Sequence, residues 1–238
     1  MGDLITVMKR YEIKYILNSE QVSFLTNSLK EYMEVDKYGK TSIASLYYDT
    51  LDNRLIRESI EKNQYKEKIR VRSYGLNKDG KPLYLELKRK AFGIVYKRRI
   101  ETNIIEIKDF FENKSNIYMN NQIGKEITYF RDLYKTLKPA CLIIYDRIAY
   151  LEKNGSLRLT IDMNPRYRVN NLNLNTSLDG IPLLDEGYAI LEIKVEDSIP
   201  LWLCKILSNG KIYKSSFSKY GEAYKKEMDK RKDLIYYV

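Results

Sequence analysis

Apolar and polar residues alternate with a period of two through much of the 238-residue chain. In "KIRVRSYG", residues 68–75, a strand would place Lys68, Arg70 and Arg72 on one face and Ile69 and Val71 on the other. The same alternation predicts strands over residues 10–17, 41–50, 66–75, 81–91, 93–103, 138–152, 156–168 and 188–197.

Other segments have the spacing of amphipathic helices. The segment 18–33 begins with Asn18 or Ser19 as its N-cap. Further helices are predicted over 51–63, 120–138, 199–210 and 218–235. Asp-Gly and Asn-Gly pairs predict hairpin turns within 77–81 and 152–156. We therefore expect one α+β domain over residues 1–238, built on a mostly antiparallel sheet, with a C-terminal helix at about 218–235.

Most predicted strands have one charged face. On those faces lie Glu12, Lys14, Lys68, Arg70, Arg72, Glu86, Lys88, Lys90, Lys97, Arg99, Glu101, Arg147, Arg158, Thr160, Asp162, Glu192, Lys194 and Glu196. For a single strand, the simplest interpretation is a half-buried sheet whose charged face meets water. Because the amphipathic helices need the apolar faces, the charged faces together must face water or line an enclosed space. Eight antiparallel strands suffice to close a barrel, and a cationic interior would need a polyanion and water to fill it.

The composition agrees with a polyanionic partner. The formal net charge is +10, and hydrophobic and charged residues make up 44% and 31% of a chain typical of soluble globular proteins. The chain has no histidine, which excludes a Ser-His-Asp triad, a Cys-His dyad and an HExxH zinc site. Chemistry would therefore depend on carboxylates, lysines, arginines, hydroxyls and a bound metal.

Two features bear on the compartment. Cys141 and Cys204 both lie in apolar runs and are interpreted as small buried hydrophobes rather than as a disulfide or a catalytic thiol. The N-terminal residues lack the apolar run of a signal peptide, and no window approaches the roughly 18 apolar residues of a membrane span. We expect a cytoplasmic protein.

Several of these strands together resemble a known family. The ordered set "RYEIKYIL", "LYYDT", "KIRVRSYG", "LELKRK", "YDRIAY", "LRLTID", "LEIK" and "SKYG" is similar to the VTC-type polyphosphate polymerase domain of the triphosphate tunnel metalloenzyme (CYTH-like) superfamily. The likeness runs from about residue 8 to about residue 225. It implies an eight-stranded antiparallel β-barrel, with helices outside, that holds a triphosphate and a divalent metal in a cationic tunnel.

The resemblance also implies roles for individual residues. Catalytic contacts to the phosphates would come from Lys14, Arg70, Arg72, Lys88, Arg147, Arg158 and Lys219. Lys97, Ser218 and Lys194 would help to bind the substrate, and Glu192 would bind Mn²⁺ or Mg²⁺. Lys90, Arg99 and Glu86 are interpreted as rim charges or as a local ion pair, outside the site.

One position departs from the wider superfamily. Arg10 stands where the first glutamate of a Glu-x-Glu-x-Lys signature would be. That departure points away from the small-molecule triphosphatases and from a two-carboxylate metal site on the first strand.

The predicted reaction is transfer of the ATP γ-phosphoryl group to a growing polyphosphate chain, with release of ADP. Phosphoryl transfer needs positioning and charge neutralisation, which arginine and lysine supply without a histidine base. A triphosphatase in the same tunnel and a non-catalytic polyphosphate- or RNA-binding module are the alternatives. Partners would be ATP and inorganic polyphosphate, with no nucleic acid. The basic C-terminal helix would be solvated or contact anionic lipid as a peripheral membrane element.

Overall fold

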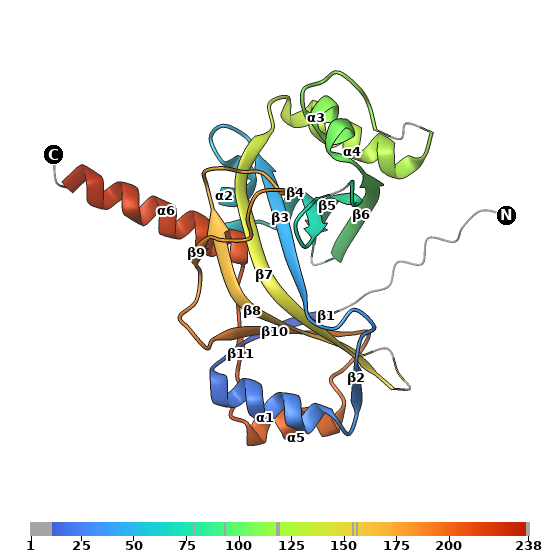
Figure 1. The fold of residues 1–238 in the computed structure, drawn as a ribbon, viewed down its shortest axis with the longest axis vertical. Coiled ribbons are helices and arrows are strands. Elements are labelled where there is room, and N and C mark those ends of the chain that lie inside the picture. The colour runs from blue at the N-terminus through green and yellow to red at the C-terminus, as the bar shows by residue number, and fades with distance from the viewer. Residues whose placement is uncertain are drawn as a thin grey trace. The chain divides into compact units, whose positions relative to one another are not determined.

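The computed structural model describes residues 11–236 except residues 79, 93, 118–119, 154 and 156, and over 231–236 it describes the backbone alone. This part of the chain is mixed α+β with a large antiparallel sheet, and its elements are coloured by position in Figure 1. The chain divides into two compact units. The described residues of the first are 11–41, 146–164 and 184–217, and those of the second are 42–145, 165–183 and 218–236.

The first unit is a sheet with the strand order β11-β1-β10-β8-β7, where β2 pairs with β7. Its elements are β1 (Tyr11–Leu17), α1 (Ser19–Leu29), β2 (Met33–Val35), β10 (Ala189–Val195), α5 (Leu201–Asn209) and β11 (Lys214–Ser215). Strands β7 (Lys138–Glu152) and β8 (Arg158–Arg168) each contribute one part to this unit. Helices α1 and α5 lie side by side (Figure 1).

Strand alternation decides which side of this sheet is buried. The apolar residues Leu191 and Ile193 of β10 and Leu159 of β8 are fully buried with Leu25 of α1 and Leu203 of α5. The residues between them in sequence point to the opposite face of the sheet. One face of the first unit therefore packs against its helices, and the other carries the charged residues.

Helix α1 begins where the sequence indicates and ends earlier than the prediction of 18–33. Asn18 caps it, since its Oδ1 accepts from the Gln21 backbone N–H at 2.8 Å, and the Gln21 side chain accepts from the Asn18 backbone N–H at 3.1 Å. The helix stops at Leu29 because Met33 begins a strand that pairs with β7. Tyr32, expected on the helix, instead stacks on Trp202 with ring centroids 4.2 Å apart.

The second unit is built on the strand order β7-β3-β4-β5-β6, and β9 (Ile181–Pro182) pairs with β8. The strands β3 (Thr41–Asp49), β4 (Tyr65–Tyr74), β5 (Leu83–Ala91) and β6 (Ile94–Thr102) follow one another. The helices are α2 (Arg54–Ile60), α3 (Ile104–Phe111), α4 (Gln122–Tyr134) and α6 (Lys219–Tyr236).

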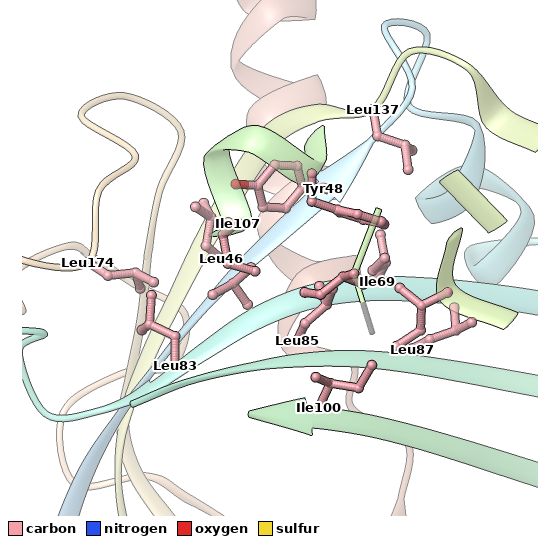
Figure 2. Packing of buried hydrophobic residues seen from close by; sticks show 14 of the residues in the cluster. Leu46, Tyr48, Ile69, Leu83, Leu85, Leu87, Ile100, Ile107, Leu137 and Leu174 are labelled. Carbon is pink, nitrogen blue, oxygen red and sulfur yellow. The ribbon is translucent and has the colours of Figure 1, made fainter. Parts of the chain in front are cut away.

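Figure 2 shows the core of the second unit. Ile69 and Val71 of β4 and Leu85 and Leu87 of β5 are buried beside Ile107 of α3. In β4 and β5 these odd-numbered residues alternate with Lys68, Arg70, Arg72, Glu86 and Lys88, so the predicted division into an apolar and a charged face is confirmed over these parts of the two strands.

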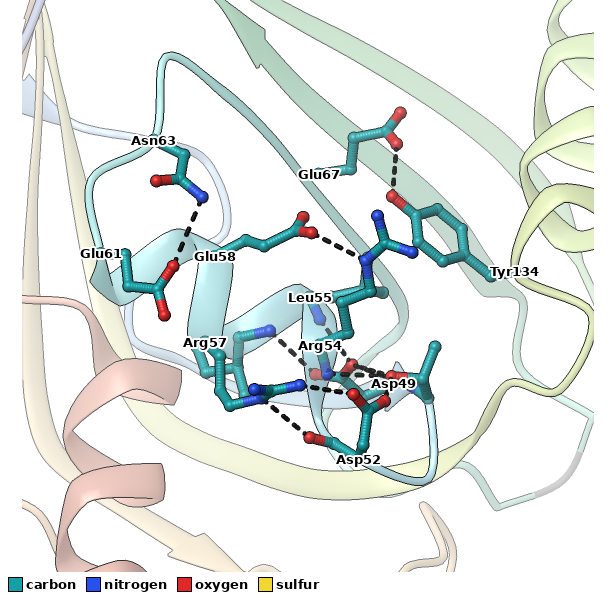
Figure 3. Close-up of polar contacts among 12 residues, drawn as sticks. Asp49, Asp52, Arg54, Leu55, Arg57, Glu58, Glu61, Asn63, Glu67 and Tyr134 are labelled. Carbon is teal, nitrogen blue, oxygen red and sulfur yellow. Dashed lines mark hydrogen bonds and ion pairs between the residues drawn. The ribbon is translucent and has the colours of Figure 1, made fainter.

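A buried carboxylate fixes the start of α2, as Figure 3 shows. Asp49 is fully buried at the end of β3 and accepts from the backbone N–H groups of Leu55 at 2.9 Å and Ile56 at 3.0 Å. It also accepts from the Tyr220 hydroxyl of α6 at 2.9 Å. Asn53, which precedes the helix, makes no side-chain cap, so Asp49 satisfies the helix N-terminus from outside the helix.

The eight predicted strands are all present within a residue or two of their expected bounds, although Arg10 lies outside the described residues. The short strands β2, β9 and β11 and the helix α3 were not predicted. The predicted turns at 77–81 and 152–156 include residues 79, 154 and 156, which lie outside the described residues. Closure into an eight-stranded barrel stays a prediction, because the recorded pairings give an open strand order. The organisation of residues 1–238 as a single domain also stays a prediction.

Candidate functional site

Glu192 is the centre of the charged face in the first unit. It lies in the middle strand β10, where its Cα pairs with Lys14 of β1 on one side and Thr160 of β8 on the other. The Lys14 ammonium is 3.7 Å from the Glu192 carboxylate, and the Lys194 ammonium donates to the same carboxylate. Two lysines from two strands thus neutralise one carboxylate that is 8% exposed.

The surroundings keep Glu192 ionised. Burial alone would raise the pKa of the carboxyl, but Lys194, Lys14 and Arg147 outweigh it and hold the pKa well below its ordinary value. Lys14 is held in place by further contacts, since it donates to the Phe217 carbonyl at 3.2 Å and lies 3.3 Å from Glu12. An ionised carboxylate between two lysine ammonium groups is suited to bind a cation or to position an anion.

Two hydroxyl groups beside Glu192 are left unsatisfied within the described part of the chain. The side-chain oxygens of Thr160 and Ser215 are buried without a hydrogen-bond partner there. Thr160 is the Cα partner of Glu192, and Ser215 is the Cα partner of Lys14. Buried polar atoms normally have partners, so these two indicate a place for a polar ligand or for water.

The other predicted cations of this unit lie on the same face. Arg147 of β7 donates to both carboxylate oxygens of the fully buried Asp162, at 2.6 and 2.8 Å. This bidentate pair fixes the guanidinium rigidly. Arg158 is exposed and its Cα pairs with Lys194. The first unit therefore gathers Lys14, Arg147, Arg158, Glu192 and Lys194 on one face, and their predicted roles stay predictions.

The charged face of the second unit is arranged in rows across β4, β5 and β6. The first row is Lys68, Lys88 and Lys97, the second is Arg70, Glu86 and Arg99, and the third is Arg72, Tyr84 and Glu101. Like charges directly opposite one another destabilise a sheet. A row of three lysines is therefore expected to destabilise the sheet, and the same row can bind a polyanion.

Glu86 is the common partner of the cations in this second cluster. The Arg70 guanidinium and the Lys97 ammonium are each 2.8 Å from its carboxylate, and Arg99 and Arg72 are 3.6 and 3.7 Å away. Burial would raise the pKa of Glu86, but Arg70, Arg72 and Lys97 hold it well below its ordinary value. One carboxylate thus faces four cations, which leaves the cluster strongly positive.

Tyrosine hydroxyls position the two arginines of β4. Arg70 donates to the Tyr47 hydroxyl at 2.7 Å, and Arg72 donates to the Tyr145 hydroxyl at 3.4 Å. Burial disfavours the charge of Arg70, yet Tyr47 and Glu86 raise its pKa above the ordinary value. Burial lowers the pKa of Lys97, in spite of Glu86.

The start of α6 reaches the same cluster. Ser218 Oγ accepts from the Lys68 ammonium at 3.3 Å and from the Gly221 backbone N–H at 3.2 Å. The ammonium of Lys219 lies over the Tyr145 ring, 4.4 Å from its centroid. The second unit therefore gathers Arg70, Arg72, Lys88, Lys97, Ser218 and Lys219, and their predicted roles stay predictions.

The chain by itself offers few metal ligands. Within the described ranges, no three His, Cys, Asp or Glu side chains come together as a metal site. Glu192 is ionised and stands beside the unsatisfied Thr160 hydroxyl, which fits a divalent cation that takes oxygen ligands. Such a cation would need phosphate oxygens or water for its remaining ligands.

From the sequence, Glu86 and Arg99 were expected outside the site, and no ligand contact was expected from Lys68, Tyr47 or Tyr145. The structure places all five beside the predicted phosphate-binding residues of the second unit. The alternation of β4 and β5 could have indicated Lys68 and Glu86. The two tyrosines are contributed by β3 and β7, whose register the sequence does not give.

Comparisons with known proteins identify the family of the chain and structures that resemble it. The family model described as "VTC domain" matches residues 9–228. A solved structure from Bacillus halodurans, described as a proposed adenylate cyclase, has a TM-score of 0.55 at 16% identity and covers 89% of this chain and 96% of its own. A protein from Vibrio parahaemolyticus with the same description has a TM-score of 0.47 at 13% identity over 91% of this chain and 98% of its own. No curated protein matches the sequence.

Proposed function

The chain belongs to the VTC domain family, and on that premise we propose that it is a polyphosphate polymerase. It would transfer the γ-phosphoryl group of ATP to the end of a polyphosphate chain and release ADP. The observation that carries this proposal is the row of Lys68, Lys88 and Lys97 beside the Arg70–Glu86–Arg99 row. These rows put positive charge on a strand face at regular spacing, as a polymer of phosphates requires.

We also propose the fold that the family resemblance implies, an eight-stranded antiparallel barrel that encloses a cationic tunnel. The family match runs through both compact units, which supports one functional domain over residues 1–238. The likeness to the Bacillus halodurans structure supports the fold alone.

In the proposed reaction, an ionised oxygen of the terminal phosphate of the chain attacks the γ-phosphorus of ATP. The bond from that phosphorus to the bridging oxygen breaks, and ADP leaves with the electron pair. Arg70 and Arg72 would neutralise the equatorial oxygens, because guanidinium groups bind two oxygens at once. Tyr47 and Tyr145 would hold these guanidinium groups in position. The attacking oxygen is already ionised, so no general base is needed.

A divalent cation, Mn²⁺ or Mg²⁺, would be held by Glu192 and would lower the charge of the phosphates when bound. Lys14 and Lys194 would then turn from the carboxylate towards the phosphate oxygens, since both ammonium groups lie beside it. Arg147, fixed by Asp162, would provide a rigid phosphate contact. Lys219 and Ser218 would contact the substrate from the start of α6.

ATP and inorganic polyphosphate are the proposed partners, with no nucleic acid, and the proposed location is cytoplasmic. No helix in the part of the chain that the structure describes is long and apolar enough to span a bilayer.

The proposal is tested by incubating the purified protein with ATP and Mn²⁺ or Mg²⁺ and separating the products on a polyacrylamide gel stained for polyphosphate. We expect a ladder of polymer that is lost in Glu192→Gln and Arg70→Ala. Lys125→Gln, an exposed lysine of α4, is the matched control and keeps the ladder. Free phosphate without a ladder would assign the protein to the triphosphatases. Binding of polyphosphate without turnover would leave a binding module.

A further inference from the structure

An aromatic and guanidinium cluster lies at one end of the cationic face in the second unit. The Arg99 guanidinium lies over the Tyr84 ring, 3.7 Å from its centroid, and donates to the Tyr74 hydroxyl at 3.1 Å. The Tyr74 and Tyr84 rings meet edge to face at 5.7 Å. Tyr84 thus supports one side of a guanidinium plane whose orientation Tyr74 fixes.

This cluster remains open to solvent. Tyr74 is 40% exposed, and the side chain of Arg99 is 36% exposed. Flat guanidinium and tyrosine surfaces of this kind stack on nucleobases, and such stacking tolerates any base because every base has a π-face. The exposed part of the cluster therefore offers a planar, partly apolar surface to a heterocyclic ring.

The charge along this face changes from one row to the next. The Lys68 row is wholly cationic, whereas the third row ends in Glu101, whose carboxylate interacts with the Tyr84 hydroxyl. Phosphates are repelled by that carboxylate and attracted to the lysine row. The end of the face that bears Glu101 and Tyr84 thus suits the uncharged part of a nucleotide, and a carboxylate can accept hydrogen bonds from ribose hydroxyl groups.

The cluster is also joined to the phosphate-binding part of the face. Arg99 lies 3.6 Å from Glu86, the partner of Arg70 and Lys97. Tyr84 precedes Glu86 by two residues, which is about 7 Å along a strand. A ribose between a base on the cluster and phosphates on the rows spans a separation of this size.

We infer that Tyr74, Tyr84 and Arg99 form a platform that binds the base of the nucleoside triphosphate, with Glu101 beside the ribose. This inference rests on the proposed function, since it names the part of that site which distinguishes a nucleotide from inorganic polyphosphate. The platform makes ATP binding depend on Tyr74 and Tyr84, which lie outside the cationic rows proposed for the polyphosphate chain.

The test compares the binding of ATP and inorganic tripolyphosphate to the full chain by calorimetry, without divalent metal so that no turnover occurs. Tyr84→Leu and, separately, Tyr74→Leu are expected to weaken ATP binding about ten-fold, because the Arg99 guanidinium loses the ring that supports it or the hydroxyl that orients it. Tripolyphosphate binding is expected to change less than about two-fold. Tyr129→Leu, an exposed tyrosine of α4, is the matched control and leaves both affinities unchanged. Two variants are used so that a folding defect in one does not decide the result.

The platform would be overturned if the tyrosine variants bound ATP and tripolyphosphate equally more weakly, or if neither affinity changed. Loss of ATP binding alone in a protein that forms no polyphosphate ladder would support the platform and refute the polymerase. If the protein forms a polyphosphate ladder and the variants lose affinity equally for ATP and tripolyphosphate, the polymerase would be supported and the platform refuted.

Discussion

Lys68 and Lys88 are direct partners across strands β4 and β5, and Lys97 continues their row on β6. Three like charges side by side on neighbouring strands oppose folding of the sheet. A functional cause is therefore expected, and the proposed polyphosphate chain lying along the row would supply it. Each lysine of the row would then contribute a phosphate contact whose strength depends on salt.

Replacing Lys88 by glutamine is expected to weaken the binding of polyphosphate about ten-fold, because one charge-assisted contact is removed. The logarithm of the affinity is also expected to fall less steeply with the logarithm of salt concentration, since fewer counterions are displaced. The measurement is a titration with polyphosphate of fixed length at several salt concentrations. Lys125→Gln makes the same change in net charge at an exposed position of α4, outside the row, and an equal effect in that variant would show that only the overall charge matters.

Replacing Glu86 by glutamine is expected to destabilise the free protein by about 3 kcal/mol, because Arg70, Arg72 and Lys97 lose a buried counter-charge. Polyphosphate should bind this variant more tightly and restore much of the lost stability. Urea unfolding with and without polyphosphate measures both effects. A variant as stable as the wild type in the absence of polyphosphate would refute the role of Glu86 as the common partner of these cations.

The depressed pKa values of Glu86 and Glu192 predict how stability depends on pH. Each carboxyl has a folded-state pKa below its ordinary value of 4.5, so the unfolded state binds more protons as the pH falls. The stabilisation is complete above about pH 4.5 and is lost progressively as the pH falls below that value. Urea unfolding between pH 7 and pH 3 measures the loss. Glu86→Gln should give a shallower dependence, and an unchanged slope would contradict the assignment.

The bidentate pair of Arg147 and Asp162 is expected to matter for stability as well as for phosphate binding. Asp162→Asn leaves the largely buried guanidinium without its carboxylate and should cost about 3 kcal/mol. Arg147→Met together with Asp162→Asn should cost less than the sum of the two single changes. A double-mutant cycle by chemical unfolding gives the coupling, and additive effects would show that the pair does not act as a unit.

Tyr220→Phe is expected to cost about 2 kcal/mol, because it removes a buried hydrogen bond to the Asp49 carboxylate. The same change should speed hydrogen exchange at the backbone amides of Leu55 and Ile56, which donate to Asp49. Tyr224→Phe on the same helix is the control, since among the described residues Asp49 accepts from Thr50, Leu55, Ile56 and Tyr220 and not from Tyr224. Unchanged exchange in Tyr220→Phe would mean that Asp49 holds α2 without help from α6.

The sequence by itself determined which residues share a strand face. The period of a β-strand is two, so Arg70 and Arg72 had to lie opposite Ile69 and Val71 once the segment was extended. The contacts confirm that division, because both arginines face Glu86 whereas Ile69 and Val71 lie in the hydrophobic core. The N-cap of α1 was equally local, because Asn18 and Gln21 are three residues apart and satisfy each other's backbone groups. The motifs that pointed to the VTC family have the same local character.

Only the tertiary structure decided which charged residues meet. Glu86 was expected only to pair with a neighbouring lysine, yet the strand register also brings Arg70 and Arg99 to either side of it. Asp49 and Tyr220 are 171 residues apart in sequence and share a buried hydrogen bond. Alternation predicts the face on which a side chain lies, but the partner across the strand depends on register and connection lengths, which are set by the packing of the whole core.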